Sequence, residues 1–295
     1  MSRQVSPSTG RPYGLARVAR IWGVARATVY RQRRPVAEPA RRPGPQGPMP
    51  DARLVEAIRA VLAGSGFSGE GYRKAWARLR FKGIRTSRRR VLRLMREHGL
   101  LAHQRSGAAR GPRNHDGTIT TDQVDVMWGT DLTSVMTGEG QAAVFVAVDH
   151  CSTECVGIHA SRGATRFEAL EPIRQGVRQR FGGFDRNIAV GLAVRHDHGS
   201  QYVAHDFQNE LAFLGIASSP AFIRAPEGNG CAERFIRTLK ENLLWLRSFD
   251  TVEELRQAAL AFKERFNRTW IVERHGYRTP AQVRAEKLQP AAMAA

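Results

Sequence analysis

The spacing of apolar residues predicts several short helices in the first hundred residues of the chain. In residues 10–34, apolar side chains recur at helical intervals on both sides of Gly23, which indicates two helices joined by a turn. The order Ala19, Gly23 and Val29 is typical of a helix-turn-helix, because a small residue lets the helices approach, glycine makes the turn and a branched residue holds the second helix. A short basic amphipathic helix pair is the alternative.

A second helical unit is predicted over residues 51–103. Three amphipathic helices are indicated, and the third runs from Ser87, a suitable N-cap, to Gly99, a suitable stop. The apolar positions that define the three helices are Leu54, Ile58, Val61, Leu62, Tyr72, Trp76, Leu79, Val91, Leu92 and Met95. Residues 64–69 match a dinucleotide-binding glycine pattern, but they follow a helix instead of a strand. We therefore interpret them as a flexible interhelix loop.

From Val124 onward the pattern changes to β-forming residues that alternate with helical segments. Strands are predicted at residues 124–137, 142–149, 153–160, 188–197 and 216–219. Helices are predicted at residues 166–180, at 201–215 with Ser200 as the cap, and from near Gly230 onward. The continuous apolar run 142–149 is typical of a central strand that is buried on both faces. This order of elements indicates an α/β fold built on a mixed sheet.

Charge is distributed unevenly along the chain, whose formal net charge is +19. Residues 1–50 hold ten basic and one acidic residue, residues 51–120 hold sixteen and five, and residues 121–295 hold twenty and twenty-one. A segregated basic half indicates a polyanionic partner, most simply nucleic acid. The predicted DNA contacts are Arg26, Thr28 and Arg31 on the second helix, and Arg88, Arg89, Arg90 and Arg93 on the last helix of the second unit. A solvated charged face is the alternative.

Proline- and glycine-rich stretches predict the domain boundaries. Six prolines fall within residues 35–50, which is typical of an extended linker, and residues 104–120 form a second polar connection. The predicted parts are a helix-turn-helix-like basic segment (1–34), a linker (35–50), a helical DNA-binding domain (51–103), a linker (104–120), a large α/β unit (121–288) and a tail (289–295).

Several function classes are excluded by composition. No apolar run reaches the roughly 18 residues that a membrane span needs, and the first thirty residues lack the apolar core of a secretory signal. The three cysteines form no C-x-x-C pair, so we expect free thiols and a cytoplasmic protein.

Three acidic residues near strand ends or a helix start are the candidates for chemistry. Asp131 lies in W-G-T-D-L-T, Asp197 directly follows a predicted strand, and Glu233 lies in the first turn of the last long helix. Lys240 follows Glu233 by seven residues and so lies on the same helix face. Each acid alone is ordinarily a turn former or a helix cap.

If the three carboxylates converge, their mutual repulsion calls for divalent cations. Carboxylates suit two Mg²⁺ or Mn²⁺ ions, which can activate a nucleophile and stabilise the leaving oxygen in phosphoryl displacement. His196 and His198 flank Asp197 and raise a metal–histidine alternative, but strand alternation directs them away from the face that Asp197 uses. Asp149 ends the buried strand and is interpreted as structural.

With these residues in view, the chain resembles the DDE transposases and integrases, in particular second-frame (OrfB) products of the insertion-sequence-three family. Asp131, Asp197, Glu233 after 35 residues, and Lys240 seven further on match that family's signature. The supporting strings are W-G-T-D-L-T, H-D-H-G-S-Q-Y, N-G-C-A-E-R-F-I-R-T-L-K-E-N and the late H-G-Y-R-T-P-A-Q. The resemblance covers roughly residues 55–285, and it implies a ribonuclease-H-like five-stranded mixed sheet with flanking helices, preceded by small all-α helix-turn-helix domains.

The resemblance also implies a function. Asp131, Asp197 and Glu233 would hold two Mg²⁺ ions, water would cleave a phosphodiester at the element's end, and the freed 3′-hydroxyl would attack target DNA. Lys240 and Arg237 would contact DNA, while Asn229 and Gly230 would set the turn that presents Glu233.

The partners implied are terminal inverted repeats, target DNA, further copies of the chain when two ends are held together, and a first-frame (OrfA) protein. The expected location is the bacterial cytoplasm, in association with the nucleoid. A catalytically silent DNA-binding regulator and a ribonuclease-H-like nuclease without joining activity remain as alternatives.

Overall fold

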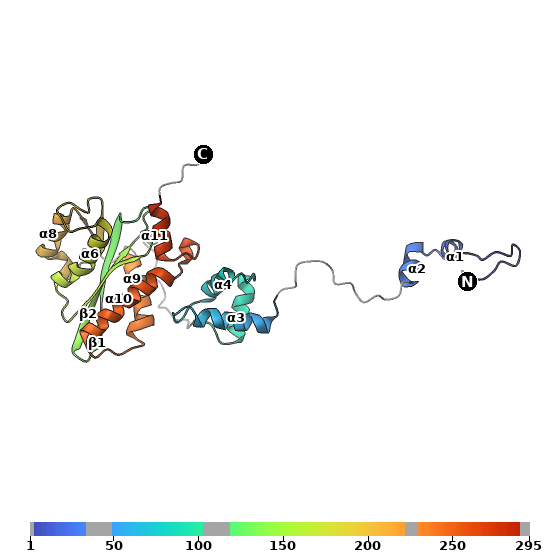
Figure 1. Cartoon of the computed structure of the whole chain (residues 1–295), viewed down its shortest axis with the longest axis horizontal. Coiled ribbons are helices and arrows are strands. Elements are labelled where there is room, and N and C mark those ends of the chain that lie inside the picture. The colour runs from blue at the N-terminus through green and yellow to red at the C-terminus, as the bar shows by residue number, and fades with distance from the viewer. Residues whose placement is uncertain (1–2, 34–48, 103–118, 222–228, 290–295) are drawn as a thin grey trace, which may run out of the picture. The chain divides into compact units, whose positions relative to one another are not determined.

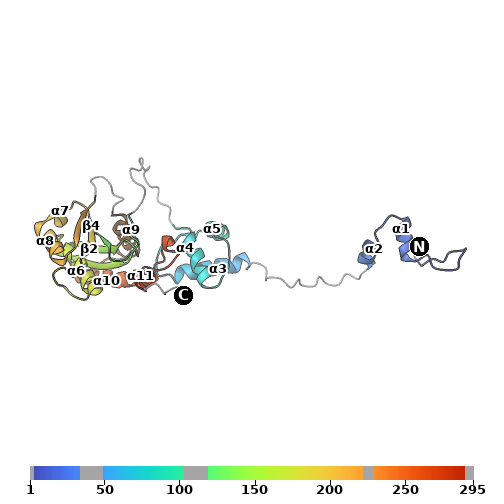
Figure 2. The same cartoon turned by 90° about the horizontal axis from the view of Figure 1, so that it is seen from above.

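The computed structural model describes residues 3–33, 49–102, 119–221 and 229–289. It divides into two compact units, residues 1–48 and 49–295. Figure 1 and Figure 2 show the chain in two views. Most of the predicted linker 35–50, almost all of the predicted linker 104–120 and nearly all of the predicted tail lie outside the described residues.

The first unit contains the predicted pair of short helices. They are α1 (Leu15–Ile21) and α2 (Arg26–Arg33). Gly23, in the turn between them, has φ +64°, a conformation that glycine adopts without strain. Ala19 is buried as predicted, but Trp22 is 65% exposed, since α1 ends at Ile21 and so short a pair cannot enclose an indole.

The second unit begins with three helices, which we call the helical domain (residues 49–102). They are α3 (Asp51–Ala63), α4 (Tyr72–Phe81) and α5 (Arg88–Glu97). Ser87 caps α5 as predicted, because its hydroxyl accepts a hydrogen bond of 3.2 Å from the Arg90 amide. The side chains at the centre of this domain are those of Leu54, Ile58, Val61, Ala75, Leu79, Val91, Leu94 and Met95.

The rest of the unit is built on a five-stranded mixed sheet. Its strands are β1 (Met127–Thr137), β2 (Gly140–Asp149), β3 (Cys155–Ser161), β4 (Ala193–His196) and β5 (Ala217–Pro220). Their order is β3-β2-β1-β4-β5, with the first three strands antiparallel and β4 and β5 parallel to β1. The predicted α/β class and the mixed five-stranded sheet are confirmed.

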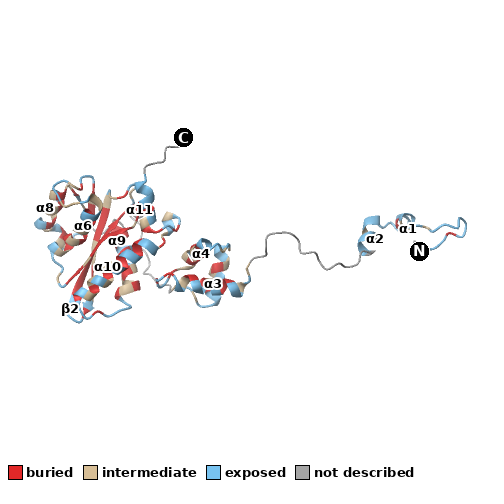
Figure 3. Ribbon diagram, viewed as in Figure 1, coloured by how far each residue is buried: buried red, intermediate tan, exposed pale blue. Residues whose placement is uncertain are grey.

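Helices cover both faces of this sheet, as the buried strands in Figure 3 indicate. The helices are α6 (Arg166–Phe181), α7 (Ser200–Val203), α8 (His205–Leu214), α9 (Gly230–Leu239), the π-helix η2 (Lys240–Leu244), α10 (Val252–Thr269), the 3₁₀ turn η3 (Glu273–His275) and α11 (Pro280–Leu288). One apolar cluster joins the sheet to α9 and α10, and a second joins it to α6 and α8. No helix among the described residues is long and apolar enough to cross a bilayer.

Two sequence predictions were wrong in extent. The fourth strand covers only residues 193–196 of the predicted 188–197, because the preceding residues form turns and Gly191 has φ +95°. The predicted helix 201–215 is two helices, since Ala204 adopts an extended conformation with ψ 141° and interrupts it.

Close packing between β3 and α6 depends on a glycine. A Cβ at Gly157 would lie 1.9 Å from the carbonyl oxygen of Pro172, which belongs to the helix backbone and cannot move aside cheaply. Gly157 therefore sets how closely α6 approaches the sheet.

We expect Gly157→Ala to lower the free energy of unfolding by about 3 kcal/mol. Overpacking typically costs about 1–3 kcal/mol, and the upper end applies here because the added methyl group would clash with backbone atoms of α6. Urea denaturation measures the change. Gly163→Ala is the matched control, since its Cβ would meet only a side-chain methyl of Thr165 at 3.6 Å. Equal stability of the two variants would contradict this account.

Candidate active site

The first two candidate carboxylates are brought together by the pairing of β1 with β4. These parallel strands pair Met127 with Ala193 and Gly129 with Arg195. Asp131 and Asp197 each lie two residues beyond the last of these pairs, so a continuation of the same register would set them opposite each other. Neighbouring strands lie about 4.8 Å apart, so the two acids would then be close in space. Asp131 itself lies within β1, where it pairs with Val146 of β2.

Asp197 lies directly after β4, where the chain turns into α7. Its Oδ1 accepts a hydrogen bond of 2.9 Å from the Gly199 amide. The flanking histidines are bonded elsewhere: His196 Nε2 shares a hydrogen bond of 2.9 Å with Ser218 Oγ, and His198 Nε2 lies 2.7 Å from the Ala221 carbonyl oxygen. These bonds disfavour the metal–histidine alternative.

The third carboxylate comes from α9, and one side chain ties the start of that helix to β1. Asn229 is buried and donates through Nδ2 to the carbonyl oxygen of Thr130, at 2.9 Å. Thr130 directly precedes Asp131, and Glu233 follows Asn229 by one helical turn. The bond therefore holds the start of α9 against β1 next to Asp131, and Gly230, the first residue of α9, follows Asn229 directly.

The glycine before Thr130 leaves room for this bond. A Cβ at Gly129 would lie 2.5 Å from Asn229 Oδ1 and 2.9 Å from His150 Nε2. The W-G-T-D string thus has a steric reason for its glycine, because a side chain there would have to displace the Asn229 amide and the His150 ring.

The electrostatics of Asp131 indicate that the candidate residues act on one another. The pKa of Asp131 is raised to about 6, first by burial and also by the charges of Asp197 and Glu233, while a hydrogen bond from the Leu132 amide lowers it. The Lys240 ammonium lowers the pKa of Asp131. Burial also raises the pKa of Glu233, and the positive charges of Arg237 and Arg234 lower it.

The donor set fits a hard divalent cation. Two carboxylates disfavour ionisation of a third, half-buried one, and a cation with oxygen ligands removes that penalty. Among the described residues, no three His, Cys, Asp or Glu side chains are already gathered closely enough to hold a metal ion. The fit thus rests on the chemistry of the donors and on the burial of Asp131.

Comparison with known proteins identifies two domains within the chain. An integrase core domain matches residues 121–226 and an HTH-like domain matches residues 50–107. The chain therefore contains an integrase core domain, preceded by an HTH-like domain. It is 28% identical to the transposase InsD for insertion element IS2A/D/F/H/I/K of Escherichia coli, over 72% of this chain and 72% of that protein. The InsD transposase for insertion element IS2-9 of E. coli strain K12 is also 28% identical, over 72% of this chain and 71% of that protein.

Solved structures are also similar to this integrase-core chain. The catalytic core domain of BIV integrase is 23% identical, with a TM-score of 0.42, over 55% of this chain and 95% of that chain. The HTLV-2 integrase catalytic core domain in complex with magnesium is 16% identical, with a TM-score of 0.41, over 55% and 97%.

Two further polar residues of the integrase core domain are buried. Asp149 accepts hydrogen bonds from the Ser152 amide and hydroxyl, at 2.6 and 2.7 Å, and from the Asp125 amide, at 3.0 Å. It shapes the turn between β2 and β3, in agreement with the structural interpretation from the sequence. Tyr202, which the sequence analysis did not select, is fully buried and stacks on His196 with ring centroids 5.6 Å apart.

The predicted DNA-contact arginines of α5 divide into two groups. Arg90 pairs with Asp51 and with the Met49 carbonyl oxygen, and Arg93 pairs with Asp51 and Glu97. These two arginines therefore hold the start of α3, a role that the sequence analysis missed because Asp51 lies 39 residues away from Arg90.

Other predicted DNA contacts are exposed. Arg88 and Arg89 lie at the exposed start of α5, and Arg237 lies on the exposed side of α9. In the first unit Arg26 and Arg31 are exposed, and Arg31 lies 3.4 Å from the hydroxyl of Thr28.

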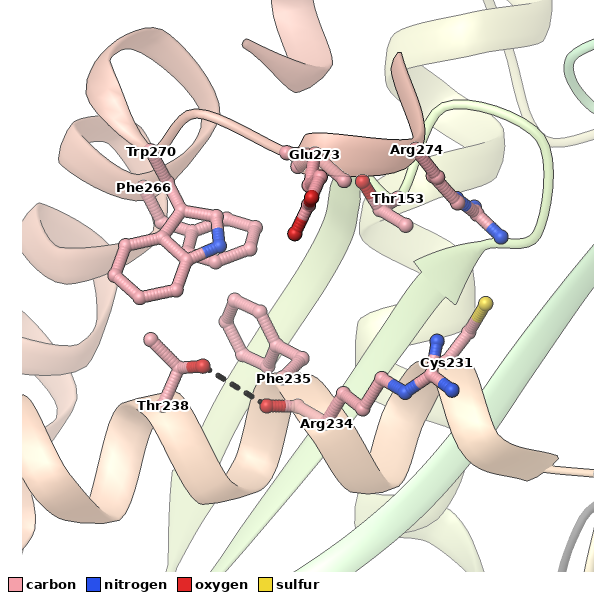
Figure 4. Close-up of a pocket in the computed structure, with 10 residues that line it drawn as sticks. Thr153, Cys231, Arg234, Phe235, Thr238, Phe266, Trp270, Glu273 and Arg274 are labelled. Carbon is pink, nitrogen blue, oxygen red and sulfur yellow. Dashed lines mark hydrogen bonds between the residues drawn. The ribbon is translucent and has the colours of Figure 1, made fainter. Parts of the chain in front are cut away.

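A cavity of about 230 Å³ lies on a different side of α9 from the carboxylates. Figure 4 shows Phe235, Phe266 and Trp270 on one side of it, and Arg234, Arg274 and Cys231 on another. Arg274 donates to the carbonyl oxygens of His150 and Cys151. The cavity contains none of Asp131, Asp197 and Glu233, so it does not enter the candidate active site.

The raised pKa of Asp131 predicts a stability effect with a definite sign. The native state binds this proton more tightly than the unfolded state, so the metal-free protein loses stability as pH rises from 3.8 through about 6. We expect Asp131→Asn to raise the free energy of unfolding by about 2 kcal/mol at pH 8 in EDTA, and to change it little at pH 3.5. Urea denaturation at the two pH values checks this.

Exposed Asp122→Asn serves as the control for this experiment and should change stability at neither pH. A gain for Asp131→Asn that is the same at both pH values would show that ionisation of Asp131 is not its cause.

Proposed function

We propose that this integrase-core protein is a transposase that cleaves DNA at the ends of an insertion element and joins the freed 3′ ends to target DNA. The observation that supports the proposal is the register of β1 with β4, whose continuation would set Asp131 opposite Asp197. The Asn229 bond supports it too, because it holds the start of the helix that carries Glu233 against β1. The relatives named above as insertion-element transposases support the choice of reaction.

Asp131, Asp197 and Glu233 are proposed to hold two Mg²⁺ or Mn²⁺ ions. Bound there, the ions would supply activation of the attacking oxygen and stabilisation of the leaving oxygen of a phosphodiester. The chain's own residues would position the third carboxylate and the DNA. Asn229 keeps Glu233 beside Asp131, and the Lys240 and Arg237 cations face the phosphates of the bound strand.

The DNA partners are proposed to be the terminal inverted repeats and a target duplex. Arg88 and Arg89 on α5 are proposed contacts to the repeats, with Arg26, Thr28 and Arg31 as further contacts from the first unit. Holding two ends together would require at least two copies of the chain, so we propose a homo-oligomer on DNA. The comparisons give no support to a separate first-frame partner, and we do not propose one.

A strand-transfer assay tests the reaction directly. The full chain is incubated with labelled duplexes that carry the DNA flanking its own coding frame, a supercoiled target plasmid and Mg²⁺ or Mn²⁺. Joined product supports a transposase, cleavage without joining supports a ribonuclease-H-like nuclease, and binding without cleavage supports a silent regulator.

Asp197→Asn should lower cleavage at least ~100-fold, because loss of one ligand removes several kcal/mol of transition-state stabilisation. DNA affinity, measured by fluorescence anisotropy, should stay within about threefold. Asp122→Asn is the control and should cut like the wild type. Cleavage retained by Asp197→Asn would remove Asp197 from the site.

The proposed contacts on α5 predict a change in salt dependence. Arg88→Ala/Arg89→Ala should weaken DNA binding and reduce the slope of log K against log salt concentration by about 2, since each lost phosphate contact contributes about 0.9. Arg268→Ala replaces an arginine whose side chain is 76% exposed on α10 and is the control. An unchanged slope in the double variant would place the DNA elsewhere.

A further inference from the structure

One part of the core against which the helical domain packs is residues 269–279, which we call the docking segment. Arg73 on α4 donates to both carboxylate oxygens of Glu273, at 3.1 Å each. Ala77, also on α4, belongs to a buried cluster with Ile271 and Tyr277. The docking segment includes the start of the late H-G-Y-R-T-P-A-Q string, to which the proposed chemistry assigns no role.

The loop between α3 and α4 inserts into the core. Phe67 is 6% exposed and belongs to the same apolar cluster as α9 and α10. Its ring meets Trp270 edge-on, with centroids 4.9 Å apart, and Phe262 at 6.1 Å. The sequence analysis interpreted residues 64–69 as a flexible loop, and this was wrong, because Phe67 anchors the loop in the core.

The same loop is bonded to the helix that carries Glu233. The Ser68 amide donates to Asn242 Oδ1 at 2.6 Å, and Asn242 Nδ2 donates to the Thr238 carbonyl oxygen at 3.0 Å. Asn242 lies in η2, which continues α9 without a break. A cavity of about 640 Å³ beside this bond is lined by Ser68, Leu101 and Arg237, among others. The proposed DNA contact Arg237 thus lies at the junction with the helical domain.

Buried charged residues also join the helical domain to the core. Glu70 is 3% exposed and pairs with Arg78 at 2.6 and 2.8 Å, while Arg78 also donates to the Thr269 carbonyl oxygen at 3.3 Å. Lys74 lies over the ring of Trp270. Separation of the domain from the core would expose the apolar surface of Phe67 and Trp270 and would break these contacts, so the packed arrangement is favoured.

The docking segment also reaches the start of α5. Trp76 packs edge-on against Tyr277 at 5.9 Å and donates through Nε1 to the Thr86 carbonyl oxygen at 2.8 Å, in the turn before α5. Arg88, the first residue of α5, stacks over Trp76 at 4.3 Å. Tyr277 has φ +66°, an unusual conformation for a tyrosine, and this conformation accompanies its packing against Trp76.

We infer that the docking segment sets the distance between the DNA sequence contacted by α5 and the phosphodiester presented to Asp131, Asp197 and Glu233. This inference rests on the proposed function. Each base pair advances DNA by 3.4 Å and rotates it by roughly 35°. A helical domain fixed to the core by packed aromatic rings cannot follow such a displacement, so the interface selects which bond is cut.

The test uses duplexes of the DNA flanking the chain's own coding frame, with 0, 2 or 4 base pairs inserted between the segment that the helical domain protects and the cut bond. With the full wild-type chain, two inserted base pairs should lower cleavage at the original bond at least tenfold. The variant Arg73→Glu/Tyr277→Ala, which loses the ion pair and the aromatic contact, should lose less than threefold on the same insertion.

Tyr277→Phe is the matched control, because it keeps the ring against Trp76 and should keep the wild-type preference. The charge swap Arg73→Glu/Glu273→Arg should restore the preference that Arg73→Glu alone relaxes. The Arg73 and Glu273 side chains are about half exposed. The Arg73→Glu and charge-swap variants therefore test the inference if the variants with Tyr277→Ala do not fold. Wild-type tolerance of the insertions, or an equal loss in wild type and disrupted variants, overturns the inference.

Hydroxyl-radical footprinting in Ca²⁺ separates this inference from the proposed function. If the chain binds but does not cut, the proposed reaction fails, while protected segments that keep a constant spacing on all three duplexes still support a fixed interface. Protections that move apart with the insertion overturn it. Absence of binding to every duplex overturns both proposals.

Discussion

The candidate site depends on the parallel pairing of β1 with β4. Two carboxylates next to each other on neighbouring strands repel, and this repulsion is strongest where water is excluded. The burial that raises the pKa of Asp131 therefore lowers the stability of the metal-free protein when Asp131 is ionised, and a bound cation would offset this loss. A hydrogen bond from Asn229 to the Thr130 carbonyl oxygen holds the start of α9, the helix that carries Glu233, against the same strand.

Much of this arrangement could be predicted from the sequence. Alternation and continuous apolar runs located β1, β2 and β3 well, because buried strands leave few polar positions. The spacing of Asp131, Asp197, Glu233 and Lys240 selected residues whose charges do act on Asp131 in the structure. The resemblance to integrase-like proteins gave the same selection independently.

The features that the sequence could not predict are mainly contacts between residues far apart in the chain. Asn229 was expected to shape a turn, but its bond to Thr130 spans 99 residues, and no local pattern signals that contact. Arg90 was expected on DNA because local helix periodicity exposes it, yet it is held by Asp51, 39 residues away. Ala189 and Leu192 were assigned to a strand because they are apolar, whereas they are buried within turns.

The glycine-rich loop 64–69 illustrates the same limit. Its composition predicts flexibility, and only the tertiary contacts of Phe67 and Ser68 make it an anchor on the helix that bears Glu233. The basic helical domain and the nearly neutral α/β core are thus one structural unit from residue 49 onward. The loop and the docking segment together join the helical domain to the core that carries Asp131, Asp197 and Glu233.

The central claim is that Asp131, Asp197 and Glu233 share divalent cations. The most direct measurement is anomalous diffraction from crystals of the full chain bound to terminal DNA and Mn²⁺. The account predicts manganese peaks about 2.0–2.6 Å from carboxylate oxygens of all three residues. Manganese bound without one of them, or a Glu233 carboxylate that remains remote from the metal in the DNA complex, would contradict it.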